Sequence, residues 1–118
     1  PLSQPLDVFA DKTHMNRVFT NLLGNAIEAA QPDVLCKITI KERIEGDKIF
    51  VTVADNGVGI SEEMQSKIFT PNFTTKSSGT GLGLAMCKTI IEQAGGEITF
   101  ETEVNKGTSF HIELPLIR

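Results

Sequence analysis

The chain of 118 residues contains no tryptophan and no tyrosine, and it has no apolar run near the ~20 residues that a membrane-spanning helix needs. Its two cysteines, Cys36 and Cys87, lie far apart, and neither has a second Cys or a paired His at metal-ligand spacing. Basic residues are scarce, with 11 Lys and Arg against 15 Asp and Glu. These absences argue against a zinc site, a redox pair, direct membrane contact and a nucleic-acid-binding surface, and they favour reduced thiols in the cytoplasm.

The remaining composition is typical of one soluble globular domain spanning residues 1–118, with 40% hydrophobic and 22% charged residues. Pro1 rather than Met opens the chain and no signal peptide follows, so we expect a segment excised from a longer protein. The sequence leaves open whether that parent protein is anchored in a membrane.

A long amphipathic helix is predicted in the first third of the chain. Asp11 is a suitable N-cap, apolar residues recur at three- and four-residue steps from Met15 to Ala30, and Pro32 stops the pattern. The opposite side of this helix carries a polar stripe, because residues three, four or seven apart share one face. That stripe comprises His14, Arg17, Asn21, Gly24, Asn25 and Glu28.

The rest of the chain reads as two β-hairpins and two shorter helices. Alternating residues predict strands over 36–42, 49–54, 97–103 and 108–114, paired around a Glu-Gly-Asp turn and an Asn-Lys-Gly turn. Helices are predicted over 61–68 and 82–94, with a Pro-, Ser-, Thr- and Gly-rich stretch over 70–81 between them. Hairpins without successive βαβ units favour an α+β fold, a two-layer sandwich in which about three helices cover one face of a mixed, mostly antiparallel sheet.

A first glycine cluster follows the second predicted strand and reads Asp55-Asn56-Gly57-Val58-Gly59-Ile60. It places a carboxylate at a strand end, before two glycines that let a flat ligand approach the backbone. This arrangement suits an adenine ring whose exocyclic amine donates to Asp55. An Asx turn without a ligand is the alternative.

A second cluster, Gly79-Thr80-Gly81-Leu82-Gly83-Leu84, leads directly into a predicted helix. Free backbone N–H groups and the positive end of the helix dipole meet there, which favours a phosphate. The spacing is neither that of a P-loop nor that of a Rossmann fingerprint. Asn21 and Asn25, one helical turn apart, offer amide oxygens to Mg²⁺, an ion that takes few protein ligands and keeps water and phosphate oxygens. A solvated helix face is the alternative for this pair.

In their order and spacing these segments resemble the GHKL family of ATP-binding domains and, within it, the histidine kinases of two-component systems. Asn-Leu-Leu-Gly-Asn-Ala at 21–26 resembles the family's N box, and the two glycine clusters resemble its glycine boxes. Phe69 and Phe73 resemble its F box, and Gly-Thr-Ser-Phe at 107–110 its last glycine motif. The resemblance extends from about residue 5 to the end of the chain.

The resemblance implies a site for ATP and Mg²⁺. Asp55 would bind the adenine amine above Gly59, Asn25 would ligate Mg²⁺, and Asn21 would lie close to the phosphates. Lys76 would contact the γ-phosphate, with a solvated loop lysine as the alternative. The implied nucleotide-binding set comprises Asp55, Gly57, Gly59, Ile60, Phe69, Phe73, Gly79, Thr80, Gly81, Leu82, Gly83, Leu84 and Thr108.

The resemblance also implies partners outside this chain. Residues 70–81 would form a lid over ATP, anchored in the core by the F-box phenylalanines if these do not touch the ligand. The phosphoacceptor histidine would lie on a separate dimerisation domain, with residues 1–5 as a remnant of the linker to it, and a response regulator would act downstream. His14 and His111 lack the His-Glu or His-Asp context of the acceptor helix, so neither is expected to accept phosphate.

The implied activity is donation of the γ-phosphate of Mg-ATP to that histidine, with no autophosphorylation by this segment alone. The ATPases of the family, and usually its anti-sigma serine kinases, resemble one another in carrying Glu where Asn21 stands, and an amide cannot act as a general base for water. Asn21 therefore favours a histidine kinase, while the intact glycine clusters and Asn25 argue against a module that binds ATP without catalysis. Glu28 stands where many histidine kinases have Lys, which removes a phosphate contact.

Overall fold

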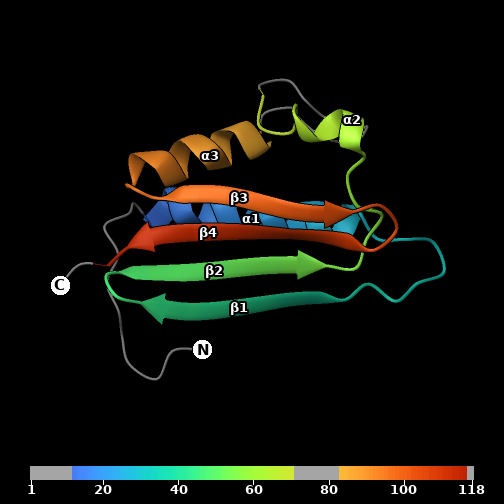
Figure 1. Cartoon of the computed structure of the whole chain (residues 1–118), viewed down its shortest axis with the longest axis horizontal. Coiled ribbons are helices and arrows are strands. Elements are labelled where there is room, and N and C mark those ends of the chain that lie inside the picture. The colour runs from blue at the N-terminus through green and yellow to red at the C-terminus, as the bar shows by residue number, and fades with distance from the viewer. Residues whose placement is uncertain (1–11, 71–82, 117–118) are drawn as a thin grey trace.

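A computed structural model describes residues 12–70 and 83–116 as one layer of helices on one layer of sheet (Figure 1). The elements in chain order are α1 (Lys12–Glu28), β1 (Ile38–Glu45), β2 (Lys48–Asp55), α2 (Glu62–Gln65), α3 (Gly83–Gln93), β3 (Glu97–Glu103) and β4 (Gly107–Pro115). Among the described helices, none has the length and hydrophobicity to cross a membrane.

The four described strands pair in the order β1-β2-β4-β3, and every neighbouring pair is antiparallel. The β1–β2 hairpin turns at Gly46, which has a φ of 58°, and the β3–β4 turn uses Asn105 at a φ of 65°. Both turns lie where the sequence predicts them. The two-layer α+β sandwich expected from the sequence is therefore confirmed.

Strand alternation sends one set of side chains towards the helices and the other set towards the open face of the sheet. The helix-facing set includes Ile49, Val53, Ile98, Phe110, Ile112 and Leu114, all buried. Helices α1 and α3 complete this core with Val18, Leu22, Cys87, Ile90 and Ile91. The open face carries polar residues such as Thr52 and His111, so the sheet has one covered and one solvent-facing side.

The two long helices pack against each other and on different parts of the sheet. Helix α1 contacts β1 and β2, while α3 contacts β3. Figure 1 shows α1 running behind the sheet and α3 along its β3 side. Helix α3 ends at Gln93, one residue before its predicted end, and the φ of 84° at Gly95 lets Gly96 N donate to Ile91 O at 2.9 Å.

Most elements differ from their predicted bounds by one to three residues, and two of these differences have a clear local cause. Strand β1 begins at Ile38 rather than 36, because the Asn56 side chain holds the preceding segment: Lys37 N donates to Asn56 Oδ1 at 2.8 Å. Helix α2 ends at Gln65 rather than near residue 68, and the chain continues in tight turns to Thr70, whose N donates to Lys67 O at 2.9 Å.

Candidate functional site

Three polar side chains form a row across the helix-facing side of the sheet, at the end where β2 meets the first glycine loop. Asp55 of β2 is the register partner of Thr108 of β4, and Thr108 is the partner of Thr102 of β3. Thr108 is buried, and its Oγ1 lies 2.8 Å from Thr102 Oγ1. The row brings together Asp55 and Thr108, two of the predicted site residues, which are 53 residues apart in the chain.

One oxygen of the Asp55 carboxylate is fixed by two backbone N–H groups. Gly57 N donates to Oδ1 at 2.8 Å, as in an Asx turn, and Thr108 N donates to the same oxygen at 3.3 Å. Among the described residues no hydrogen bond reaches Oδ2. The carboxylate is therefore oriented by the backbone, with one oxygen left to accept a hydrogen bond from a ligand.

The glycines of the first cluster lie where a side chain would collide with neighbouring backbone. A Cβ on Gly57 would stand 2.4 Å from Ala29 O at the end of α1, and a Cβ on Gly59 would stand 2.4 Å from Glu103 O. Val58 connects the same segments, because its N donates to Ala29 O at 2.8 Å and its O accepts from Asn105 N at 2.8 Å. The loop is thus clamped between α1 and the β3–β4 turn.

Two residues of this clamp were missed by sequence reasoning. Gln31 Nε2 donates to Asn56 O at 2.8 Å, to Gly57 O at 3.1 Å and to Asn105 O at 3.2 Å. Thr102 Oγ1 accepts from Ile60 N at 2.9 Å. The register of the predicted β3–β4 hairpin was a signal for Thr102, since it places Thr102 opposite Thr108. No local pattern in the sequence points to Gln31.

The two asparagines of the polar stripe extend the site along α1. Asn21 lies at the contact with α3, where its Oδ1 would be 3.4 Å from a Cβ on Gly83, the first residue of that helix. Ala29, directly after the end of α1 at Glu28 and eight residues past Asn21, meets the first glycine loop about 12 Å away by helical rise. Asn25 stands halfway and is half-buried. Helix α1 therefore connects the two glycine clusters.

Asn21 also touches a thiol. Burial raises the pKa of the Cys87 thiol to about 11, and the hydrogen bond from Asn21 lowers it in part. Cys87 Sγ is 3.8 Å from Val18 O, and its side chain is fully buried between α1 and α3. The protonated thiol is thus a packing group beside Asn21, and both cysteines of the chain are free.

The donor set on α1 fits a metal that arrives with a nucleotide. Amide oxygens are hard ligands of the kind that Mg²⁺ takes, and Asn25 offers one from a half-buried position. Within residues 12–70 and 83–116 there is no cluster of three or more His, Cys, Asp or Glu that could hold a metal. Phosphate and water oxygens would have to complete the coordination of an ion held by Asn25.

Three predicted site residues have side chains that pack in the core. The Phe69 ring makes edge contacts with Phe100 at 5.9 Å and Phe110 at 6.4 Å between centroids. Ile60 and Leu84 also pack against the buried cluster, so they can reach a ligand only through their backbone or one edge. The Phe69 ring thus packs in the core, and its role in anchoring a lid stays a prediction. The remaining predicted residues, Phe73, Lys76, Gly79, Thr80, Gly81 and Leu82, lie outside the described residues, as does the predicted lid after Thr70.

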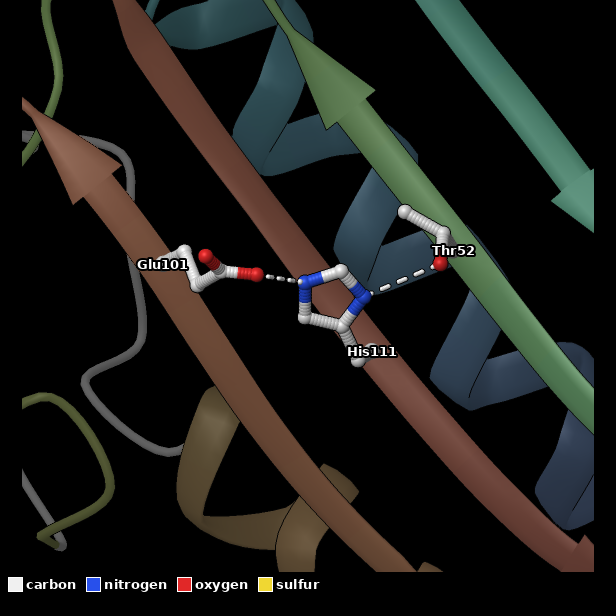
Figure 2. A network of polar contacts seen from close by, with 3 residues as sticks. All are labelled: Thr52, Glu101 and His111. Atoms are coloured by element: carbon white, nitrogen blue, oxygen red, sulfur yellow. Dashed lines mark hydrogen bonds and ion pairs between the residues drawn. The ribbon is translucent and has the colours of Figure 1, made fainter.

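His111 lies away from this site. Figure 2 shows the His111 ring on the open face of the sheet, between Glu101 and Thr52, with the helices behind the strands. Its Nδ1 is 3.0 Å from Thr52 Oγ1 and its Nε2 is 2.8 Å from Glu101 Oε1. The sheet thus separates His111 from Asp55 and Asn21. His14 is exposed near the start of α1.

Comparisons with known proteins agree with this geometry. The family model described as histidine kinase-, DNA gyrase B- and HSP90-like ATPase matches residues 10–118. Sporulation kinase D of Bacillus subtilis (strain 168) is 42% identical over 113 residues, which are 96% of this chain and 22% of that protein. Sensor histidine kinase ZraS of Salmonella typhimurium (strain LT2) is 44% identical over 108 residues, 92% of this chain and 23% of that protein. The chain therefore spans about a fifth of the length of these relatives.

The solved catalytic domain of histidine kinase ThkA, in a nucleotide-free form, superimposes with a TM-score of 0.78 at 45% identity. The match covers 92% of this chain and 70% of that domain. The chain thus belongs to the histidine kinase-, DNA gyrase B- and HSP90-like ATPases and is, within that family, a histidine kinase catalytic domain.

Proposed function

We propose that this domain binds Mg-ATP along α1 and donates the γ-phosphate to a histidine on a separate dimerisation domain of its parent protein. The observation that carries the proposal is the Asp55 carboxylate, whose Oδ1 is held by Gly57 N and Thr108 N while Oδ2 has no hydrogen bond within the described part of the chain. The exocyclic amine of adenine can donate a hydrogen bond in the plane of the ring, and Oδ2 can accept it.

The nucleotide would then extend from Asp55 towards the start of α3. The ring would lie on Gly59, Asn25 would ligate Mg²⁺, and Asn21 would reach the phosphates. Backbone N–H groups at 79–83 would donate hydrogen bonds to the phosphate oxygens, since the first N–H groups of a helix have no partner within it. A bound Mg²⁺ would neutralise phosphate charge, and the chain's own residues would supply position and orientation.

The wider setting is part of the same proposal. Residues 1–5 would lead from the dimerisation domain, residues 70–81 would cover the nucleotide, and the phosphohistidine would pass its phosphate to a response regulator. The domain would act in the cytoplasm, whether or not its parent is anchored in a membrane. Hydrolysis of ATP and serine phosphorylation are not favoured, because Asn21 cannot activate water and the compared relatives are named sporulation kinase and sensor histidine kinase.

Calorimetric titration with Mg-ATP, combined with a phosphate-release assay on the same samples, tests the proposal. We expect Asp55→Asn to weaken binding about 10- to 100-fold, because the amide would accept the two backbone N–H bonds on its oxygen and turn an N–H group towards the adenine amine. Asp33→Asn is the matched control, since Asp33 is exposed and its φ of 63° suits Asn.

Binding that depends on Asp55 with negligible phosphate release is the expected result. Steady Mg-dependent hydrolysis would instead favour an ATPase. Equal affinities of the two variants would refute the adenine contact.

A further inference from the structure

A cavity of about 360 Å³ opens between α1 and α3, beside Asn21 and on the side away from Asp55. It is lined by Asn16, Arg17, Thr20, Asn21 and Met86. Of these residues, only Asn21 belongs to the proposed nucleotide site. The volume falls in the range of small-ligand pockets, ~300–1,000 Å³, and the lining contains one cation and no acid. The only charged side chain that this lining offers to a ligand is therefore a cation.

The cation of the cavity is Arg17, and most of its guanidinium N–H donors have no acceptor among the described residues. Its Nη1 lies 3.8 Å from Met86 Sδ, and a thioether is a weak acceptor. Arg17 is exposed, and no carboxylate of the described residues is within ion-pair distance of it. Five N–H donors in a planar fork thus stand at the cavity with one weak contact among them, and such a fork matches two oxygens of a phosphate.

The position of Arg17 on α1 specifies which phosphate it would meet. Arg17, Asn21 and Asn25 follow each other at intervals of four residues, so they share one helix face at about 6 Å per step. Ala29 continues the series to the Asp55 loop, at the adenine end of the proposed site. Arg17 is therefore one turn beyond Asn21 at the opposite end, where the last phosphate of the chain would lie.

We propose that Arg17 contacts the γ-phosphate of bound ATP and makes the domain prefer the triphosphate to the diphosphate. This inference rests on the proposed function, because it takes the orientation of the nucleotide from Asp55, Asn25 and Asn21. In this structure Met86 Sδ is the acceptor of the guanidinium. The γ-phosphate replaces this weak acceptor with charged oxygens, so the exchange strengthens the hydrogen bonds of Arg17. Arg17 thus supplies the phosphates with a positive charge from the N-terminal half of α1, whereas Glu28 at the C-terminal end of this helix cannot.

The test compares affinities of the chain for Mg-ATP and Mg-ADP by calorimetry, in the wild type and in Arg17→Ala. A hydrogen-bonded charge pair contributes about 10- to 100-fold in affinity, so the wild type should bind Mg-ATP at least about 10-fold more tightly than Mg-ADP. Arg17→Ala should lose most of this preference. The ADP affinity should stay within about threefold. Arg17→Lys should keep part of the preference, because it retains the charge and loses the planar fork.

Arg43→Ala is the matched control for the loss of one positive charge. Arg43 lies on the open face of the sheet, over the Phe50 ring at 4.5 Å and in an ion pair with Glu45, so its removal should leave the ATP-to-ADP ratio unchanged. The urea midpoint of each variant checks that it is folded, and Arg17→Gln provides a second neutral variant.

The outcomes separate this inference from the proposed function. An ATP preference that persists in both Arg17→Ala and Arg17→Gln overturns the γ-phosphate contact and leaves the proposed nucleotide site intact, as does a wild type that binds ATP and ADP equally. A wild type that binds neither nucleotide overturns both proposals.

Discussion

Replacing Gly59 by alanine tests how tightly the first glycine loop is packed against the β3–β4 turn. Gly59 has a φ of 76°, and a Cβ there would stand 2.4 Å from Glu103 O and 2.9 Å from Val104 Cα. Both of these atoms belong to the backbone, so neither can rotate away like the end of a flexible side chain. The loop or the turn must move, and Asp55 lies four residues before Gly59.

Gly46 provides a matched control in the β1–β2 turn, at the other end of the sheet. Its φ of 58° is similar, but a Cβ added there would meet nothing within 4 Å beyond its chain neighbours. A left-handed conformation costs an L-residue ~1–2 kcal/mol at either position. Only Gly59→Ala adds the overpacking cost of ~1–3 kcal/mol. We therefore expect a loss of about 1–2 kcal/mol for Gly46→Ala and about 2–5 kcal/mol for Gly59→Ala.

Urea unfolding of the two variants measures this difference, provided that their m-values match that of the wild type. Mg-ATP titration should in addition show weaker binding by Gly59→Ala and unchanged binding by Gly46→Ala, since only the former displaces the loop after Asp55. Equal destabilisation of the two variants would refute the close packing of the loop against the turn.

Two further predictions concern residues beside the site. Because the pKa of the Cys87 thiol is raised from 9.0 to about 11 in the folded state, the unfolded thiol ionises first, and the stability present below pH 9 is lost as the pH rises through about 11. In urea unfolding between pH 8 and 11, the wild type should therefore lose up to about 3 kcal/mol relative to Cys87→Ala. A difference that does not depend on pH would contradict burial as the cause. Gln31→Ala should lower the free energy of unfolding by about 1–2 kcal/mol and weaken Mg-ATP binding, because the Gln31 amide donates to three carbonyls. The control Gln93→Ala, at an exposed position, should change neither quantity. Equal effects of the two substitutions would contradict the clamp.

The sequence alone determined the elements and their chemistry. Apolar steps of three and four residues specify α1 and place Arg17, Asn21 and Asn25 on one face, because side-chain direction in a helix depends only on local geometry. Alternation and the Gly46 and Asn105 turns specify the two hairpins for the same reason. The glycine clusters were recognisable from composition and spacing, and their likeness to known catalytic domains is confirmed by the comparisons.

Only the tertiary structure decided which residues meet. The antiparallel pairing of β2 with β4, which are not consecutive in the chain, brings Thr108 N to the Asp55 carboxylate, and no local pattern specifies that register. Packing of α1 on α3 likewise places Arg17 against Met86, 69 residues away. These contacts depend on how whole elements fit together in one core, and so their partners could not be read from the neighbours of either residue.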